Sequence, residues 1–582
     1  MTTMKLIEAL EVAKAKPASG ADVLTVPLVC GFSPLHLRTF MAAHLQLLFP
    51  ERRVDIQTGF YGDFLGNLQR LETASVDTAA VVLEWTDLDP RLGIRRLGGW
   101  GPGDLGDILD NVRQQTARIW QLAEQVSGVA PLVICPPTLP LPPVSLTSGW
   151  QSSAFDLDLR ECVSTLEAAV AHRPGMKIVN PQRLARLSPP SERFDVKSEL
   201  LAGFPYTLSH AATVAEVLAR LIRDPAPKKG LITDLDDTLW SGILGEIGVE
   251  GISWDLDHRS QKHGLYQQTL RALSEQGVLV AIASKNDRNL VDEAFRRANL
   301  ILPPGRVFPV QANWGPKSES VARILATWNV GADSVVLVDD SAMDLAEVRA
   351  AHPDLECILF PKDDDQAAYQ LLERLRDLFG KESVSPEDAI RLESIRAAHS
   401  LAADSPAMAG SPDRFLEQAE GALTLAFGKD SPDPRALELV NKTNQFNLNG
   451  RRYTDASWRG YLKNPKVFLL LVAYEDKYGP LGKIAVLSGR WGKKRLFVDT
   501  WVMSCRAFSR RIEHRCLEQL FKRSGANEIL FDFQATSRNG PLQDFFAGFL
   551  GGPPQPSQIL SSKLFFEKCP PLFQKIEEPL NG

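Results

Sequence analysis

Two aspartates follow a short apolar segment and could divide the work of phosphoryl transfer. Asp234 and Asp236 come directly after the apolar residues 230–233, in the run DLDDT. If that segment is a strand, residues two apart point to the same side, so both carboxylates are presented together. One carboxylate can attack phosphorus, while the other protonates the leaving oxygen and later activates water. We therefore predict catalytic roles for both aspartates.

A hydroxyl and a cation, which the same chemistry needs, occur further along the chain. Ser284 comes at the end of the apolar segment 278–283 and could bind the phosphoryl oxygens. Lys317, in the run NWGPKSES, could neutralise part of their charge. We favour Lys317 as the cation, with Lys285 and Lys362 as alternatives.

A magnesium ion would offset the remaining repulsion between carboxylates and phosphate. Asp339 and Asp340 come at the end of the apolar segment 335–338, where they could bind the ion. A lone Asp-x-Asp is more often a solvated turn or a helix cap. Here the acidic pair, the hydroxyl, the lysine and the second acidic pair follow one another in order, and this order favours phosphoryl transfer.

Residues 226–380 must supply the scaffold of this site. Short apolar segments alternate there with amphipathic stretches such as YQQTLRALSEQG. This alternation predicts a doubly wound, Rossmann-like parallel sheet that binds its ligand beyond the carboxyl ends of the strands. Between Asp234 and Ser284 the sequence holds one loop and one helix, so we predict no large cap domain. An open site suits a phosphoryl group on a large molecule, or a site that other domains close.

Two further domains flank the central one. Residues 1–225 alternate apolar and amphipathic segments, which predicts an α/β domain, and the run RDPAPKKG is typical of a linker. Residues 381–420 are charged and contain Ala, Ser and Pro, as expected of a connector. Residues 421–582 mix several strands with few helices, which predicts an α+β domain. The predicted fold class is therefore multidomain α/β.

The composition argues against several other classes of protein. With 582 residues the chain is too long for one hydrophobic core, and 44% hydrophobic with 23% charged residues is typical of a globular protein. No segment approaches the apolar length of a membrane span, and nothing resembles a secretory signal, so we expect a cytoplasmic protein without a membrane partner. The net charge of −6 gives no case for nucleic-acid binding. Seven scattered cysteines without a CxxC pair argue against a disulfide framework or a zinc ribbon.

The ordered motifs resemble those of the haloacid dehalogenase superfamily, which has a DxDxT run, a serine or threonine after a second strand, a lysine and a terminal DD. The resemblance implies that Asp234 forms an aspartyl-phosphate and that Asp236 is the general acid/base. It implies that Thr238 and Ser284 support geometry and phosphate binding. It also implies a Mg²⁺ ion held by the Asp234 carboxylate, the Asp236 main-chain carbonyl and Asp339.

The sequence around these motifs resembles one group of that superfamily more narrowly. The runs TDLDDTLWSGILGEIGVEGI, ASKND, QANWGPKSES and VLVDDSAMDLAEV resemble the FkbH-like proteins of subfamily IIIC. Near the C-terminus, NKTNQFNLNGRRYT and DTWVMSCRAFSRRIE resemble the GNAT-like, acetyltransferase-like tail of that group. The first 225 residues are similar to its SGNH-hydrolase-like or flavodoxin-like domain, more by arrangement than by motif. The resemblance covers nearly the whole chain and is strongest at residues 230–360.

FkbH-like proteins are glyceryl transferase/phosphatases of polyketide biosynthesis. The resemblance implies that D-1,3-bisphosphoglycerate is dephosphorylated and that its glyceryl unit is loaded as a thioester on the phosphopantetheine arm of an acyl carrier protein. The alternative is a Mg²⁺-dependent phosphatase that acts on another phosphoester and uses the flanking domains for recognition. A carrier-docking scaffold with a vestigial site is a third reading, against which the intact aspartates argue.

The acyl-transfer half of such a function has fewer signals in the sequence. Cys505 is a candidate transient acyl carrier, because the neighbouring Arg506 would favour its thiolate, and a semi-buried structural cysteine is the alternative. Arg506 and Asn444 could bind the pantetheine arm, although amide-rich turns are common in proteins of every kind. The loop 506–511 lacks glycines that could cradle a pyrophosphate, so we do not expect acetyl-CoA binding.

Ser33 is the one residue of the first domain that could suggest catalysis. It follows an apolar segment in the run GFS, but the usual Gly-Asp-Ser wording of a hydrolase is absent. Neither His36 nor His210 lies in a convincing Asp-x-x-His context. We therefore expect a structural or carrier-docking domain.

Overall fold

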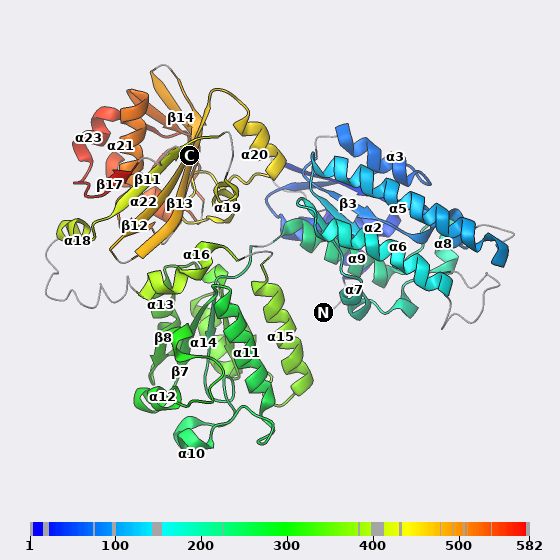
Figure 1. Ribbon diagram of the computed structural model, residues 1–582, viewed down its shortest axis with the longest axis horizontal. Helices are drawn as coiled ribbons and strands as arrows, with labels where there is room; N and C mark the ends of the chain where they lie inside the picture. Colours follow the sequence, from blue (N-terminus) through cyan, green and yellow to red (C-terminus); the bar gives the residue numbers. More distant parts are fainter. Residues whose placement is uncertain are drawn as a thin grey trace. The chain divides into compact units, whose positions relative to one another are not determined.

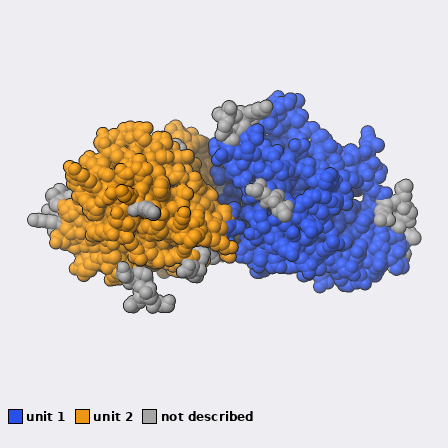
Figure 2. Space-filling view, turned by 90° about the horizontal axis from the view of Figure 1, so that it is seen from above, with its two compact units in different colours: residues 1–225, 454–456 blue, residues 226–453, 457–582 orange. Residues whose placement is uncertain are grey.

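The computed structural model describes most of the chain, and its contacts divide it into two compact units (Figure 2). Unit 1 comprises residues 1–225 and 454–456, and unit 2 comprises residues 226–453 and 457–582. The described residues are 4–14, 22–73, 76–95, 100–141, 154–224, 226–381, 384–396, 412–429, 433–477, 479–492, 494–504, 507–508, 510–536 and 538–577.

Unit 1, whose residues 1–225 are drawn in blue to cyan in Figure 1, is built on a five-stranded parallel sheet in the order β2-β1-β3-β4-β5. Its strands are β1 (Val23–Val29), β2 (Arg53–Thr58), β3 (Ala79–Val82), β4 (Leu132–Cys135) and β5 (Met176–Ile178). Its helices are α1 (Leu6–Lys14), α2 (Leu35–Leu48), α3 (Phe64–Gln69), α4 (Trp85–Leu88), α5 (Leu105–Ser127), α6 (Ala154–Ala171), α7 (Pro181–Leu187), α8 (Val196–Ala202) and α9 (Leu208–Arg223). One core packs α1, α2 and α9 on the sheet, and a second core packs α3, α5 and α6 on it.

The first part of unit 2 holds the sheet that carries the predicted site. This sheet is also parallel and five-stranded, in the order β10-β9-β6-β7-β8 (Figure 1). Its strands are β6 (Gly230–Thr233), β7 (Leu279–Ser284), β8 (Val307–Ala312), β9 (Val335–Asp339) and β10 (Glu356–Leu359). Its helices are α10 (Leu244–Gly251), α11 (Gln261–Glu275), α12 (Arg288–Ala294), α13 (Lys317–Trp328), α14 (Ala342–Ala351) and α15 (Asp365–Phe379), followed by α16 (Pro386–Ala389).

The sequence of this sheet explains why it forms. Every residue of β6, β7 and β9 is buried, which is why these strands read as apolar runs rather than as alternating patterns. One core packs α11, α12 and α15 on the sheet, and another packs α13 and α14. Ser341 begins α14 by accepting a hydrogen bond from the backbone N–H of Asp344, and Asp364 begins α15 in the same way with Ala367. These helices therefore start at the carboxyl edge of the sheet.

The last part of unit 2 contains a seven-stranded mixed sheet in the order β16-β15-β14-β13-β12-β11-β17. Its strands are β11 (Ala422–Phe427), β12 (Val467–Asp476), β13 (Gly479–Arg490), β14 (Arg495–Met503), β15 (Glu528–Phe531), β16 (Ile559–Ser561) and β17 (Lys575–Glu577). Its helices are α18 (Pro412–Gln418), α19 (Pro434–Lys442), α20 (Asp455–Leu462), α21 (Ile512–Ser524), α22 (Gly540–Leu550) and α23 (Ser562–Lys568). The β11–β14 strands pair antiparallel, whereas β14 and β15 pair parallel across α21.

The fold class that the sequence predicts, multidomain α/β with a central parallel sheet, is confirmed. Between β6 and β7 the structure holds α10 and α11 with their loops, so no separate cap domain is inserted there. In the described parts of the chain, none of the helices combines the length and the apolar character that crossing a bilayer requires.

Candidate active site

The pairing of β6 with β9 brings the first and last acidic motifs together. Thr233 lies opposite Val338 in this parallel pair, and the backbone N–H of Asp234 donates to the Val338 carbonyl at 3.0 Å. Asp234 and Asp339 are therefore neighbours at the carboxyl edge of the sheet. Ligands of doubly wound sheets bind at this edge.

Three carboxylates gather at that edge. One oxygen from each of Asp234, Asp339 and Asp340 lies within 4.8 Å of the others. Asp234 is 7% exposed and Asp339 is fully buried, and Asp234 Oδ1 has no hydrogen-bond partner. Closely spaced buried oxygens of this kind fit a hard divalent cation such as Mg²⁺, which prefers carboxylate ligands. Asp340 is thus a further candidate metal ligand beside Asp234 and Asp339, which the sequence predicts.

Lys317, which is 2% exposed, pairs with two of these three carboxylates. Its ammonium contacts Asp339 and lies 3.3 Å from Asp234 Oδ1 and 3.4 Å from Asp344 Oδ2. Burial lowers the pKa of Lys317, but the charges of Asp234 and Asp339 outweigh burial and raise that pKa above its usual range. The lysine is therefore charged. It begins α13, where Glu347 of α14 accepts a hydrogen bond from its backbone N–H at 3.1 Å.

The two alternative lysines have other partners. Lys285 pairs with Asp344 at 2.7 Å, and Lys362 pairs with Asp340 at 2.9 Å. Of the three lysines that the sequence leaves open, Lys317 is the one placed against Asp234.

Burial and mutual repulsion raise the pKa values of the site carboxyls, whereas Lys317 lowers them. Burial, reinforced by the charge of Asp339, raises the pKa of Asp234 to about 7, although Lys317 lowers it. Burial also raises the pKa of Asp339. One ammonium therefore does not compensate all the charge of the cluster at neutral pH, and a divalent cation would complete that compensation.

The Asp236 carboxylate has three hydrogen-bond donors of its own. Its Oδ1 accepts hydrogen bonds from Trp240 Nε1 at 3.0 Å and from the Leu244 N–H at 3.1 Å. Its Oδ2 accepts from Asn286 Nδ2 at 2.9 Å. Asn286 was not among the residues predicted from the sequence, although it lies two positions after Ser284 in the ASKND run.

The two predicted hydroxyl residues both lie at this edge. The Ser284 hydroxyl lowers the pKa of the Asp234 carboxyl, and Ser284 Oγ accepts a hydrogen bond from Asn286 Nδ2 at 3.2 Å. Thr238 is fully buried, and its hydroxyl accepts from the Asp340 N–H at 3.1 Å. Thr238 thus ties the loop after β6 to the loop after β9.

The residues predicted for acyl transfer lie elsewhere in unit 2. Cys505 and Arg506 fall outside the described residues. Asn444 Oδ1 accepts a hydrogen bond from Arg452 at 2.6 Å. In the same run, Asn447 Oδ1 accepts from the Gly450 N–H at 2.7 Å, so part of this amide-rich segment serves to hold its own turn.

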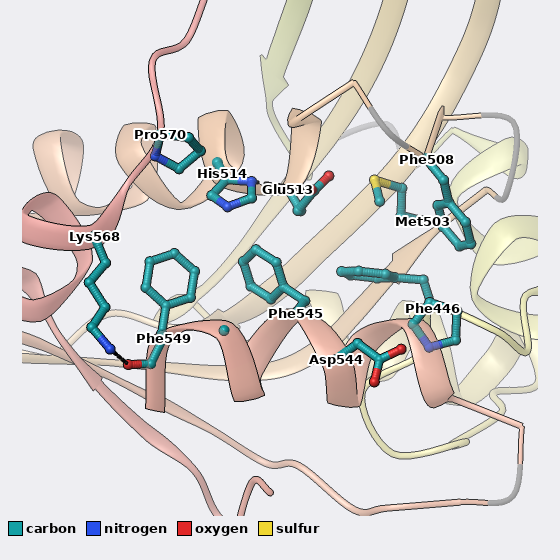
Figure 3. A pocket seen from close by; sticks show the side chains of 12 residues that line it. Phe446, Met503, Phe508, Glu513, His514, Asp544, Phe545, Phe549, Lys568 and Pro570 are labelled. Atoms are coloured by element: carbon teal, nitrogen blue, oxygen red, sulfur yellow. Dashed lines mark hydrogen bonds and ion pairs between the residues drawn. The ribbon is translucent and has the colours of Figure 1, made fainter. Parts of the chain in front are cut away.

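A cavity of about 570 Å³ lies in the last part of unit 2, between α21 and α22 (Figure 3). Phenylalanines from both sides line it, and the carboxylates of Glu513 and Asp544 also belong to its wall. Lys568, which lies at one end, donates to the Phe549 carbonyl at 2.7 Å (Figure 3). The full lining is Phe446, Met503, Phe508, Glu513, His514, Pro541, Asp544, Phe545, Gly548, Phe549, Lys568 and Pro570. Its size is in the range of small-molecule sites.

His210 of unit 1 is part of a buried polar network rather than of a hydrolase triad with Ser33. Its Nε2 lies 2.9 Å from Thr138 Oγ1, and its Nδ1 lies 2.9 Å from Ser188 Oγ. Thr138 in turn donates to the buried Glu84 at 2.7 Å. Both ring nitrogens of His210 are therefore occupied by residues other than Ser33.

This burial predicts an acid sensitivity of unit 1. Burial lowers the pKa of His210 from 6.5 to about 3, so the stability that its neutral ring contributes is lost as pH falls from about 6.5 towards 3. Replacing His210 by Gln should therefore reduce the loss of unfolding free energy between pH 7 and pH 4.5. Burial raises the pKa of Asp87 to about 8, so Asp87 changes the stability of unit 1 with pH in the opposite direction. Urea unfolding of the parent chain and of His210→Gln isolates the contribution of His210, because both chains contain Asp87. Equal pH slopes would contradict the prediction.

Comparisons with known proteins support the fold of the site. No protein-family model matches the sequence, and no curated protein matches it. The N-terminal part of the protein BF1531 from Bacteroides fragilis, a crystal structure that contains a phosphatase domain complexed with Mg, is similar with a TM-score of 0.52. The two are 18% identical, and the match covers 65% of this chain and 100% of that chain. This likeness shows the fold.

Two further solved structures are similar only weakly. An uncharacterized protein from Corynebacterium glutamicum gives a TM-score of 0.19 at 20% identity, with 26% of this chain and 98% of that chain covered. The salicylyl-acyltransferase SsfX3 from a tetracycline biosynthetic pathway gives a TM-score of 0.22 at 12% identity, with 36% and 56% covered. Neither informs the fold or the site.

Proposed function

We propose that the central domain is a Mg²⁺-dependent phosphatase that works through an aspartyl-phosphate. The observation that carries the proposal is the cluster of Asp234, Asp339 and Asp340 at the carboxyl edge of the sheet, in which Lys317 pairs with Asp234 and Asp339. A fold shared with a phosphatase-containing structure that holds Mg is consistent with it.

The residues would divide the reaction between them. Asp234 attacks phosphorus, and Lys317 and Ser284 bind the phosphoryl oxygens. Asp236 gives a proton to the leaving oxygen and later removes one from the attacking water. A Mg²⁺ ion held by Asp234 and Asp339 would neutralise charge on the phosphoryl group.

Metal binding gives a direct prediction. Saturating Mg²⁺ at about 100 times its dissociation constant should stabilise the parent chain by about 2.7 kcal/mol, because the ion binds the folded cluster and not the unfolded chain. Asp339→Asn should lose most of this gain. Denaturant unfolding with Mg²⁺ and with EDTA measures it, and phosphate release should stop in EDTA. Equal stabilisation of both chains would place the ion elsewhere.

We further propose that the whole chain is a glyceryl transferase/phosphatase. In this reading it acts on D-1,3-bisphosphoglycerate and loads the glyceryl unit on the phosphopantetheine arm of an acyl carrier protein in polyketide biosynthesis. The resemblance of the central motifs and of the C-terminal runs to FkbH-like proteins supports it. An acyl phosphate is already activated, so the protein would mainly have to position a thiol against it.

The cavity between α21 and α22 is a reasonable place for a pantetheine arm. Its volume of about 570 Å³ and its phenylalanine walls suit an extended, uncharged chain. Its charged lining residues are Glu513, Asp544 and Lys568. Cys505 and Arg506 remain candidates for the transfer itself.

Weighing the carrier protein by mass spectrometry tests the transfer. Incubation with D-1,3-bisphosphoglycerate, Mg²⁺ and the phosphopantetheinylated carrier should add a glyceryl mass that hydroxylamine removes, as expected of a thioester. Phosphate release without any mass gain would favour the alternative, a phosphatase that acts on another phosphoester and uses the flanking domains for recognition.

A further inference from the structure

We propose that Trp240 and Asn286 are positioning residues that hold the Asp236 carboxylate for proton transfer. The proposal rests on the phosphatase function above, because it concerns how the acid/base group of that reaction is held. Trp240 Nε1 donates to Asp236 Oδ1 at 3.0 Å, and Asn286 Nδ2 donates to Asp236 Oδ2 at 2.9 Å. Each carboxylate oxygen therefore has its own side-chain donor.

The two donors come from different strand ends and are themselves fixed. Trp240 belongs to the loop after β6, is fully buried, and packs its ring 6.2 Å from that of Phe295. Asn286 belongs to the loop after β7 and is 3% exposed. The N–H of Leu244, the first residue of α10, adds a third hydrogen bond to Asp236. The carboxylate is thus tied across two neighbouring strands and has little freedom to rotate.

The same amide fixes Asp236 relative to the phosphate site. Asn286 Nδ2 also donates to Ser284 Oγ at 3.2 Å, and Ser284 is the hydroxyl proposed above to bind the phosphoryl oxygens. Proton transfer needs donor and acceptor atoms within about 2.6–3.2 Å, so a displacement of about 1 Å is enough to slow it. The loss of either side-chain donor would release Asp236 from this geometry.

Two steps of the reaction depend on Asp236 differently. In the first, an Asp234 oxygen bonds to phosphorus, the bond from phosphorus to the leaving oxygen breaks, and Asp236 gives that oxygen a proton. A nitrophenolate leaves without a proton, but an alkoxide does not. In the second, a water oxygen bonds to phosphorus, Asp236 takes a proton from the water, and the Asp234–phosphorus bond breaks to release phosphate. Misplacing Asp236 therefore slows the first step for alkyl phosphates and the second step for every substrate.

Trp240→Phe and Asn286→Ala test this against a matched control. Trp254 is a second buried tryptophan of the same domain, and its Nε1 donates to the Asn299 carbonyl at 3.1 Å instead of to a carboxylate. Trp254→Phe therefore removes the same atoms and one indole N–H without touching Asp236. Each variant is assayed in the full chain with Mg²⁺ on p-nitrophenyl phosphate and on glycerol 2-phosphate.

The expected result is a selective loss. For Trp240→Phe and Asn286→Ala, kcat/KM on glycerol 2-phosphate should fall by about 30-fold or more, whereas kcat/KM on p-nitrophenyl phosphate should stay within about threefold of the parent chain. On p-nitrophenyl phosphate, kcat should fall by about tenfold and KM should fall with it, because hydrolysis of the aspartyl-phosphate becomes limiting. Trp254→Phe should leave the ratio of the two kcat/KM values unchanged.

If kcat/KM falls equally on both substrates, or if Trp254→Phe changes the ratio of the two kcat/KM values in the same way, the positioning role is overturned. The phosphatase function would be unaffected. Failure of the parent chain to release phosphate from either substrate would overturn the phosphatase function and the positioning role together. If Trp240→Phe does not fold, Asn286→Ala alone decides the outcome.

Discussion

Replacing Asp234 by Asn should lower Mg²⁺-dependent phosphate release by about 10³-fold or more, because an amide cannot attack phosphorus. The substitution keeps the size of a side chain that is 7% exposed, so the packing of the sheet edge is preserved. The measurement is release of phosphate at saturating substrate. Asp292→Asn, on the exposed surface of α12, serves as the control and should keep the parent rate. Unchanged release by Asp234→Asn would remove the nucleophile from the mechanism.

A stability measurement separates this loss of activity from a loss of folding. Because the pKa of Asp234 is raised to about 7, above its ordinary 3.8, its contribution to stability is present at low pH and is lost as pH rises through about 7. Without metal at pH 8, the ionised Asp234 therefore destabilises the folded chain. Asp234→Asn should be at least as stable as the parent there. A markedly less stable variant would point to a structural cause for its inactivity.

The sequence could predict the chemistry around β6, β7 and β9 because the functional residues there lie at the ends of apolar segments. Asp234, Ser284 and Asp339 each come at or directly after a fully buried apolar run, and such runs become parallel strands whose carboxyl ends meet at one edge. The pairing of β6 with β9, which brings Asp234 beside Asp339, could not be deduced from apolar pattern alone, because it depends on which strands cross over.

Contacts between site side chains that depend on side-chain direction could not be predicted from the sequence. Asn286 lies in the same run as Ser284, but nothing in that run indicates that its amide reaches Asp236 across two strand ends. Asp344 similarly approaches Lys317 from the first turn of α14. Such contacts are set by the position of each helix start on the sheet, which local sequence specifies only loosely.

Polar runs outside the site were harder to interpret for a related reason. His210 and Thr138 lie far apart in the sequence, yet they bond inside unit 1 at 2.9 Å. Asn447 holds a turn through Gly450. A buried polar side chain needs a hydrogen-bond partner wherever the fold provides one, so an amide or histidine in the sequence can have a purely structural role.

Replacing Lys317 by Met should lower both phosphate release and the free energy of unfolding. Phosphate release should fall by about 10²–10³-fold, because a fixed cation that faces the phosphoryl oxygens is lost. The free energy of unfolding without metal should fall by about 3 kcal/mol near neutral pH, because Asp339, which is fully buried, loses its ion-pair partner. Mg²⁺ should recover part of the stability, since it can compensate the carboxylates, but it should not recover the activity.

Lys285→Met provides the control for this prediction. Lys285 also pairs with Asp344, at 2.7 Å, but its side chain is 37% exposed and does not contact Asp234 or Asp339. Exposed ion pairs contribute about 0–1 kcal/mol, so this variant should lose little stability. If one buried ammonium both holds the acidic cluster together and binds the phosphoryl group, Lys317→Met and Lys285→Met must differ in phosphate release and in the free energy of unfolding. Equal behaviour of Lys317→Met and Lys285→Met would mean that Lys317 has no special role in the cluster, which would then depend on the metal alone.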